Sequence, residues 1–388
     1  MKVINSIADL RAIARRRIPK SIFEYVDHGS YEELTLARNR SDFDALRFRQ
    51  RVLVDVARQS LGTTIQGEPA AMPLVIAPTG MTGLVHADGE ILAAQAAEEA
   101  GVPFTLSTVS ICSIEDVRAA VKRPFWFQLY VMRDRGYTEV LLNRAAAAGC
   151  PLLMLTVDIP VSGLRRRDAK NGLAVPPRLT MRNALDIATK PKWATQVLFG
   201  KRRTFGNLVD RMPHTGLATL SQWISTQFDA SVTWQDIEWV RARWKGRLVI
   251  KGILDPADAR QAASLGIDGL VVSNHGGRQL DGASSTIAAL PSIVEAVQGR
   301  CEVLLDGGVR SGQDILKAVA LGARATMTGR AFLYGLGAHG RAGVRMAIDI
   351  MARELQVSLA LTGCNDIREA GPQLLLPDVA QHRISGEL

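Results

Sequence analysis

The chain has few cysteines, and they show no pattern. The four stand far apart and form no CxxC: Cys112, Cys150, Cys301 and Cys364. This usage indicates reduced thiols rather than a disulfide framework. No cysteine and histidine spacing typical of zinc is present, so no metal site is expected. RNA-binding signatures and basic helices interleaved with aromatic residues are also missing, which argues against a nucleic-acid partner.

Long apolar runs are missing as well. No segment approaches the roughly 20 consecutive apolar residues that cross a bilayer. Residues 1–20 lack the apolar core and cleavage pattern of a secretory signal. We therefore expect a protein inside the cell whose contact with a membrane, if it has one, is peripheral.

Positive charge is in excess. Lys and Arg number 47 and Asp and Glu 38, for a formal net charge of +9. This balance favours an anionic partner such as an acid substrate, a phosphate or a membrane surface. The 388 residues are 47% hydrophobic, enough for one large core or two smaller ones.

Short apolar runs alternate with helical patterns. The predicted strands are Leu74–Ala77, Phe104–Ser107, Phe125–Leu129, Leu152–Val157, Leu248–Lys251, Leu270–Ser273, Val303–Asp306 and Ala325–Thr328. Helices are predicted between them, for example at Gly89–Ala100, Ser113–Val121, Pro256–Leu265 and Gly312–Leu321. Repeated strand–helix units imply parallel strands, and eight of them predict a (β/α)₈ TIM barrel. The active site of such a barrel lies at the carboxyl ends of its strands.

Polar residues recur where each apolar run stops. In chain order they are Pro78 and Thr79, Ser107 and Thr108, Gln128 and Tyr130, Thr156 and Asp158, Lys251, Ser273 and His275, Asp306, and Gly329 and Arg330. One such residue is an ordinary strand end exposed to water. Eight in series indicate the lining of a single pocket.

The last two units have the composition of a phosphate site. Asp306-Gly-Gly-Val-Arg310-Ser-Gly follows the seventh strand and Thr328-Gly-Arg330 the eighth, the usual phosphate position in this barrel. No GxGxxG follows a first strand, so a dinucleotide on a Rossmann fold is not expected. A flavin mononucleotide, a sugar phosphate and a nucleotide all remain open at this point.

The segment Leu270–Gly282, LVVSNHGGRQLDG, is the most informative. His275 at a strand end is placed as a general base, and Arg278 can hold a carboxylate through two parallel hydrogen bonds. The alternative is a structural histidine beside a solvated arginine. A base and an anion clamp on one loop indicate chemistry on a small acid.

From about Pro19 to Gly363 the chain resembles the FMN-dependent 2-hydroxy acid dehydrogenases and oxidases. The most specific motif is Ser273-Asn-His-Gly-Gly-Arg-Gln-Leu-Asp281. Supporting motifs are Ala77-Pro-Thr, Gln128-Leu-Tyr130, Thr156-Val-Asp158, Lys251-Gly, Asp306-Gly-Gly-Val-Arg310 and Gly329-Arg330. Within this family the chain is most similar to the bacterial membrane-associated L-lactate dehydrogenases, and three segments carry this similarity: STVSICSIEDV, VTWQDIEWVR and VIKGILDP.

The resemblance implies FMN as cofactor and a set of residues that hold it. Ala77, Pro78 and Thr79 lie along the flavin, and Ser107, Gln128, Thr156 and Ser273 belong to its surroundings, the first three bonding the ring. Lys251 stabilises the anionic reduced flavin from the N1–C2 edge. The ribityl phosphate is assigned to Asp306, Gly308, Arg310, Gly329 and Arg330.

The resemblance also assigns the substrate side. Tyr25, Tyr130, Arg165 and Arg278 hold the substrate, His275 is the base, and Asp158 orients it and stabilises its imidazolium form. Without the resemblance Tyr25 is an ordinary core residue of an amphipathic helix. Because Arg165-Arg166-Arg167 is a run, Arg166 or Arg167 stays possible if the loop shifts by one residue.

The implied reaction is oxidation of an L-2-hydroxy acid to the 2-oxo acid, L-lactate to pyruvate, with a quinone as electron acceptor. Gly80 stands where family oxidases carry alanine, which favours a quinone over oxygen. Val109 and Ser162 are small pocket residues, so (S)-mandelate or another larger acid is an alternative, as is an oxygen-using oxidase. A phosphate-binding isomerase barrel and a non-catalytic membrane scaffold are the other classes considered.

The whole chain, 1–388, is predicted to be one domain. It divides into an N-terminal helical segment 1–71, a barrel 72–340 and a C-terminal helical tail 341–388. An insertion at 165–231 mixes cations with Trp193, Leu198 and Phe199, which predicts a lid, a membrane contact or both. The resemblance implies a homotetramer, either in the cytoplasm or peripheral on the cytoplasmic side of the inner membrane.

Overall fold

The computed structural model describes residues 3–172, 180–202, 204–208 and 227–377. Eight parallel strands pair in the order β3-β10-β9-β8-β7-β6-β5-β4, and a parallel bridge from Ile76 to Phe104 joins the two outer strands. The bounds are β3 Leu74–Ile76, β4 Thr105–Ser107, β5 Trp126–Leu129, β6 Leu152–Thr156, β7 Arg247–Ile253, β8 Gly269–Val272, β9 Glu302–Asp306 and β10 Ala325–Thr328. The predicted (β/α)₈ barrel is confirmed, and every strand begins and ends within two residues of its prediction.

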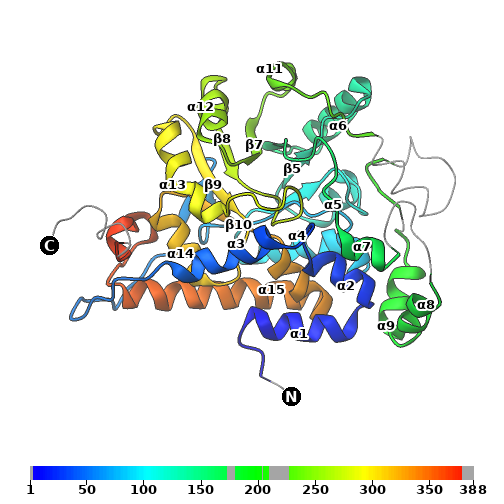
Figure 1. Cartoon of the computed structure of the whole chain (residues 1–388), viewed down its shortest axis with the longest axis horizontal. Coiled ribbons are helices and arrows are strands. Elements are labelled where there is room, and N and C mark those ends of the chain that lie inside the picture. Colours follow the sequence, from blue (N-terminus) through cyan, green and yellow to red (C-terminus); the bar gives the residue numbers. More distant parts are fainter. Residues whose placement is uncertain (1–2, 173–179, 203, 209–226, 378–388) are drawn as a thin grey trace.

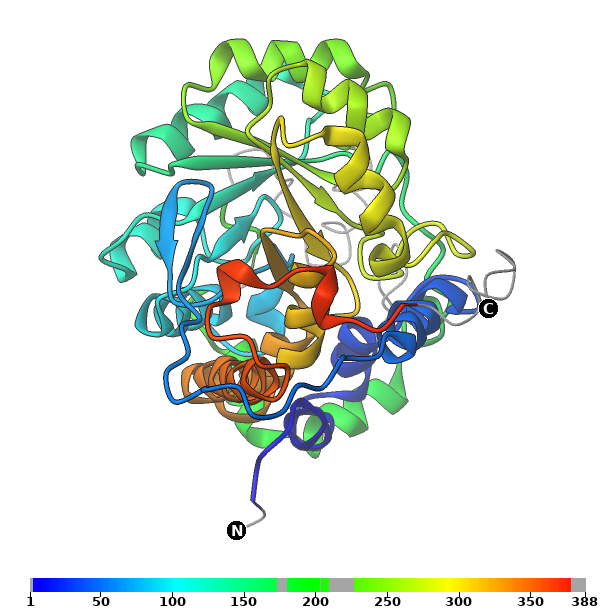
Figure 2. The same cartoon turned by 90° about the vertical axis from the view of Figure 1, so that its left-hand side faces the viewer.

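Helices follow the strands and surround them (Figure 2). They are α4 Gly89–Ala100, α5 Ile114–Ala120, α6 Arg135–Ala147, α11 Trp234–Arg243, α12 Pro256–Ser264, α13 Thr286–Val297, α14 Gly312–Ala320 and α15 Arg330–Leu361. Their starts follow local chemistry, since the hydroxyls of Ser113, Ser285 and Ser311 accept N–H groups of the first turns of α5, α13 and α14. Gly101, at φ +70°, ends α4 in the left-handed conformation that favours glycine.

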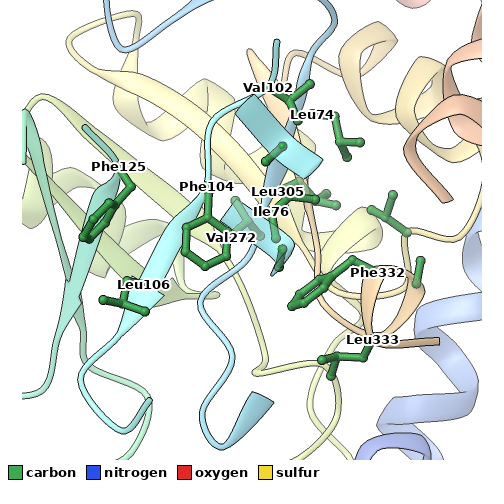
Figure 3. Close-up of a cluster of buried hydrophobic side chains, with 14 of the residues drawn as sticks. Leu74, Ile76, Val102, Phe104, Leu106, Phe125, Val272, Leu305, Phe332 and Leu333 are labelled. Atoms are coloured by element: carbon green, nitrogen blue, oxygen red, sulfur yellow. The ribbon is translucent and has the colours of Figure 1, made fainter. Parts of the chain in front are cut away.

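Successive side chains along each strand point to opposite faces, so the core has two layers, one inside the barrel and one between the strands and the helices. Val249, Val271 and Met327 belong to the cluster that fills the barrel, whereas neighbours such as Leu248 and Leu270 pack with the surrounding helices. Figure 3 shows part of the outer layer, where strand residues lie beside α15. Each fully buried aliphatic side chain contributes about 1.5–3 kcal/mol, so both layers are needed to hold the ring.

The N-terminal segment begins with three helices, α1 Ile7–Arg17, α2 Lys20–Asp27 and α3 Leu34–Ala45. The predicted N-terminal helical segment 1–71 also contains two short strands. There β1 Thr63–Ile65 and β2 Glu68–Ala70 form an antiparallel hairpin.

Tertiary contacts explain this hairpin. Ile65 is fully buried in the cluster that fills the barrel. The backbone N–H of Gln66 donates to Glu302 at the start of β9 (2.8 Å), and the indole N–H of Trp126 donates to Glu68 (3.2 Å). The hairpin therefore covers the amino-terminal mouth of the barrel, opposite the strand ends that carry the polar residues.

The C-terminal tail is joined to the barrel more closely than expected. One long helix, α15, begins at Arg330 directly after β10 and crosses the predicted boundary at 341, with a non-helical break at His339 and Gly340. It packs against α1, α4 and α14 along one side of the molecule (Figure 1). Two short 3₁₀ turns, Ile367–Glu369 and Pro372–Leu374, follow. Residues 378–388 of the predicted tail lie outside the described residues.

The insertion after β6 contains short helical pieces. These are α7 Arg166–Lys170, α8 Met181–Ala188, α9 Pro191–Trp193 and the π-helix Ala194–Leu198. Figure 1 shows α8 and α9 together at one end of the molecule, near α2. Residues 173–179, 203 and 209–226 of the predicted insertion lie outside the described residues.

The hairpin generates a stability prediction. Ile65→Ala removes a fully buried side chain from the barrel interior, so we expect the free energy of unfolding to fall by about 2–5 kcal/mol. Thr64→Ala, at an exposed position of the same strand, is the control and should change it by about 0.5 kcal/mol or less. Denaturant unfolding followed by circular dichroism measures both, and equal stabilities of the two variants would contradict this role for the hairpin.

Candidate active site

The carboxyl ends of the strands open into a cavity of about 270 Å³. Fourteen of the predicted site residues line it: Tyr25, Ala77, Pro78, Thr79, Tyr130, Arg165, Lys251, His275, Arg278, Asp306, Gly308, Arg310, Gly329 and Arg330. The other five lie at or just after the ends of β4, β5, β6 and β8: Ser107, Gln128, Thr156, Asp158 and Ser273. One end of the barrel thus gathers residues that are up to about 300 positions apart.

His275 sits on a tight loop after β8. It adopts a left-handed φ of +56°, and Gly276 and Gly277 continue at +67° and +73°. The backbone N–H of His275 donates to the Ser273 hydroxyl (3.1 Å), and its ring Nδ1 lies 2.9 Å from Asp158 Oδ1. Burial lowers the pKa of His275 below its usual value, although Asp158 opposes the shift. The ring is therefore held neutral near pH 7 and fixed in direction, as a general base requires.

A second buried ion pair lies beside this base. Lys251 Nζ is 3.0 Å from Asp306 Oδ2 and donates to the Ser273 hydroxyl (2.8 Å), which in turn donates to Asp306 (3.0 Å). Burial disfavours the charge on Lys251, but Asp306 and Asp158 outweigh it and raise the pKa. Lys251 is therefore held in its charged form, paired with Asp306 at the cavity wall.

This contact shows what the Asp306 carboxylate binds in the protein. The resemblance placed Asp306 among the phosphate ligands, yet its carboxylate is directed at Lys251. A carboxylate facing a phosphate would be repelled by it, whereas beside the lysine it is neutralised. Asp306 therefore belongs to the surroundings of Lys251.

Two arginines meet at Tyr25. The guanidinium carbons of Arg278 and Arg165 lie 4.7 Å and 6.0 Å from the centre of the Tyr25 ring. Burial and the nearby charge of Arg165 lower the pKa of Arg278. The Nε of Arg165 is buried without a hydrogen-bond partner among the described residues. Two adjacent guanidinium groups with an unpaired donor form a site suited to a carboxylate.

The structure also resolves the ambiguity in the arginine run. Arg166 forms an ion pair with Glu32, and Arg167 Nε lies 3.5 Å from Glu33. Both side chains are about half exposed, at 55% and 49%. Arg165 is the member of the run that lines the cavity.

Comparison with known proteins agrees with this geometry. The family described as FMN-dependent dehydrogenase matches residues 14–377. The chain belongs to this family. Its cofactor is therefore FMN, and it is an enzyme of the FMN-dependent dehydrogenase type.

Related proteins span nearly the whole length of the chain. An L-lactate dehydrogenase of Stenotrophomonas maltophilia (strain R551-3) is 49% identical over 376 residues, covering 96% of this chain and 99% of that protein. An L-lactate dehydrogenase of Caulobacter vibrioides (strain NA1000 / CB15N) is 48% identical over 375 residues, with 96% and 98% covered.

Solved structures of family members superpose well. The monotopic membrane protein (S)-mandelate dehydrogenase has a TM-score of 0.92 at 36% identity, covering 97% of this chain and 100% of that one. A mandelate oxidase has a TM-score of 0.83 at 38% identity, with 96% and 98% covered. These likenesses cover the barrel and its additions together.

Buried polar atoms in this FMN-dependent dehydrogenase fit the cofactor. Gln128 Nε2 and Thr156 Oγ1 are buried with no hydrogen-bond partner among the described residues. Ser107 donates its hydroxyl to Gln128 Oε1 (3.0 Å) and so orients that amide. A buried unpaired polar group costs about 1–3 kcal/mol, and a flavin ring supplies the missing partners. The residues present therefore suit FMN.

Two residues that the resemblance assigns to the phosphate, Gly308 and Arg330, also have structural contacts of their own. A Cβ at Gly308 would lie 2.1 Å from the carbonyl oxygen of Asn39, so this glycine is required by the close approach of α3. Arg330 directs its guanidinium at the backbone carbonyls of Val26, Gly276 and His28. Arg310 is part-exposed at the cavity and donates to its neighbouring Val309 carbonyl (2.9 Å). Its assignment to the phosphate stays a prediction.

Several site residues were not predicted from the sequence. Phe205 and Phe228, from the insertion, line the cavity, and the ring of Phe228 lies 4.7 Å from that of Tyr130. Asp168 lines it too, 3.8 Å from Arg165. No local pattern could have identified these residues, because the fold of the insertion brings them to the cavity.

One side chain of the insertion differs from its predicted role. The membrane alternative for the insertion needs Trp193 to be exposed, but it is 7% exposed and donates its indole N–H to the Leu84 carbonyl (2.8 Å). Leu198 and Phe199 are exposed, at 40% and 74%. Trp193 therefore anchors the insertion on the barrel.

The base gives a pH prediction. Because His275 accepts a proton only when neutral, kcat/KM should fall at acid pH, with a midpoint below the ordinary histidine pKa of 6.5. Since Asp158 raises that pKa, Asp158→Asn should move the midpoint to lower pH and also reduce kcat. Asp258→Asn, on the exposed face of α12, is the control. Steady-state rates over a pH series measure this, and a midpoint that Asp158→Asn leaves in place or raises would contradict the assignment.

Proposed function

We propose that this FMN-dependent enzyme oxidises an L-2-hydroxy acid, L-lactate, to the 2-oxo acid, pyruvate, and passes the electrons to a quinone. The observation that carries the proposal is one cavity that holds both the His275–Asp158 pair and the Arg165–Arg278 pair. The first suits proton removal and the second suits a carboxylate. The two L-lactate dehydrogenases, 49% and 48% identical, support lactate as the substrate.

The arginines bind and orient the acid. Arg278 and Arg165 donate to its carboxylate, and each hydrogen bond to a charged group contributes about 1.5–3 kcal/mol. Burial and the charge of Asp158 raise the pKa of the Tyr130 hydroxyl. Tyr130 therefore stays protonated and acts as a hydrogen-bond donor to the substrate.

His275 accepts the proton that leaves the substrate. With Nδ1 engaged by Asp158, Nε2 is the nitrogen that accepts a proton from the substrate hydroxyl or its α-carbon. Asp158 then stabilises the imidazolium, and a base so positioned contributes about 10²–10⁴-fold. FMN, when bound, accepts the two electrons. The charge of Lys251 would stabilise the negative charge of the reduced flavin.

The cavity wall also supports the larger-substrate alternative. The cavity that Tyr130 lines is also lined by Val109, Ser162, Phe205 and Phe228. An apolar, partly aromatic wall suits a bulky side chain, and the solved relatives that match this chain act on mandelate by their names. (S)-mandelate is therefore the second candidate substrate.

The proposal about the electron acceptor rests on Gly80. A Cβ at this position would lie 2.6 Å from Val109 Cγ2, so the loop and the pocket wall are packed for glycine. We propose a quinone rather than oxygen as the acceptor. Peroxide formation equal to lactate consumption would select the oxidase alternative.

We also propose a peripheral membrane contact on the cytoplasmic face, made by α8 and the end of the π-helix. Met181, Leu185 and Phe199 are exposed at 83%, 66% and 74%, with Arg182 and Lys192 exposed nearby. No helix in the described ranges is both long and apolar enough to cross a bilayer. The homotetramer stays a prediction from the resemblance.

The substrate proposal has a direct spectroscopic test. Anaerobic L-lactate should bleach the oxidised-flavin absorption of the FMN-loaded protein. His275→Ala should keep its flavin and bleach at least about 10²-fold more slowly, because the base is lost. An unchanged wild-type spectrum with lactate and a bleached one with (S)-mandelate would select the second candidate. Wild-type rates in His275→Ala would remove the base assignment.

The membrane contact is tested with vesicles. Leu185→Ser/Phe199→Ser should reduce co-sedimentation with phosphatidylglycerol vesicles at low and high salt, because exposed apolar area is removed. Val357→Ser/Leu361→Ser, at residues of α15 exposed at 51% and 56%, is the matched control. Equal sedimentation of the two double variants would refute this surface.

A further inference from the structure

The C-terminal end of α2 faces the cavity. The last carbonyls of any helix lack partners within it and carry the negative end of the helix dipole. Here the carbonyls of Tyr25 and Val26, and that of the cap residue His28, accept hydrogen bonds from two arginines, Arg278 and Arg330. Both arginines therefore satisfy the free carbonyls at the end of α2, and both also line the cavity.

Arg330 links this helix end to the loop of the base. Its Nε donates to Val26 O (2.8 Å), its Nη2 to His28 O (3.0 Å) and its Nη1 to Gly276 O (2.8 Å). The side chain is 8% exposed and starts from the first residue of α15, which packs beside α2 (Figure 1). Three of the five N–H groups of a planar guanidinium are therefore engaged by backbone on two separate segments. Lysine cannot reproduce this fork.

The carbonyl of His28, which accepts a hydrogen bond from Arg330, also accepts one from Arg278, the arginine proposed to bind the substrate. Arg278 Nη1 lies 3.1 Å from His28 O, which also receives Arg330, and 2.5 Å from Tyr25 O. Alongside, the backbone N–H of Ser30 donates to Gly277 O (3.0 Å). Arg330 thus holds both the acceptor of Arg278 and the loop residue that follows His275.

We propose that the guanidinium of Arg330 positions the His275–Arg278 loop and does not bind the FMN phosphate. Arg310 is left as the phosphate-binding arginine. The inference rests on the proposed function in one respect, namely that Arg278 binds the substrate carboxylate.

The experiment compares Arg330→Lys with Arg310→Lys in the full-length holoenzyme. The fluorescence of released flavin gives the FMN dissociation constant, and oxalate, titrated into FMN-saturated protein, reports the carboxylate site through the flavin spectrum. We expect Arg330→Lys to retain FMN as the wild type does and to weaken oxalate binding about tenfold or more, as loss of a charge-assisted hydrogen bond predicts. Arg310→Lys should show the reverse: weaker FMN and unchanged oxalate binding.

Hydrogen exchange supplies a readout that does not depend on flavin or substrate. In Arg330→Lys, peptides that contain Ser30 and Gly277 should exchange faster than in the wild type, while those of α12 stay unchanged. If Arg330→Lys does not fold, Arg330→Gln, which keeps amide donors near the same carbonyls, is measured in its place.

An FMN dissociation constant that rises as far as in Arg310→Lys, or oxalate binding equal to wild type, overturns the proposal. A wild-type protein that binds oxalate but is not reduced by L-lactate refutes the proposed substrate, and leaves the role of Arg330 to be decided by the same titrations.

Discussion

Buried charge at the carboxyl end of the barrel is the constraint on which the rest of the structure depends. Charged groups in a water-poor cavity are tolerated only when they are paired or bonded. Here Asp158 pairs with His275, Asp306 pairs with Lys251, and backbone carbonyls accept hydrogen bonds from Arg278. The Arg165 Nε lacks a partner among the described residues, and so do polar atoms at the ends of β5 and β6. The unpaired groups mark where substrate and FMN are expected to bind.

The barrel alone does not complete this arrangement. Helix α2 supplies the carbonyl acceptors for two arginines, and α3 packs so closely on the loop after β9 that Gly308 has no room for a side chain. The hairpin of β1 and β2 covers the opposite mouth of the ring. The N-terminal segment is therefore part of both the core and the cavity.

The insertion has two faces with different chemistry. Trp193 and Arg202 fasten it to the barrel: the indole bonds Leu84 O, and the guanidinium bridges Asp88 and Asp116 at the starts of α4 and α5. Phe228 reaches the cavity beside Tyr130. The exposed apolar residues of α8 and the π-helix point to a surface contact instead. One inserted segment thus joins the substrate pocket to the face proposed to meet a membrane.

The sequence by itself determined the eight strands, their flanking helices and the polar strand ends, because short apolar runs and helical periodicity are local properties. The resemblance then brought His275, Arg278 and Lys251 to one site, and the fold agrees. Only the tertiary structure decided which arginine of the run enters the cavity, that Asp306 pairs with Lys251, and that Arg330 bonds α2. Those outcomes depend on which buried partner lies within hydrogen-bond distance, and distant parts of the chain supply it, as Val26 does for Arg330.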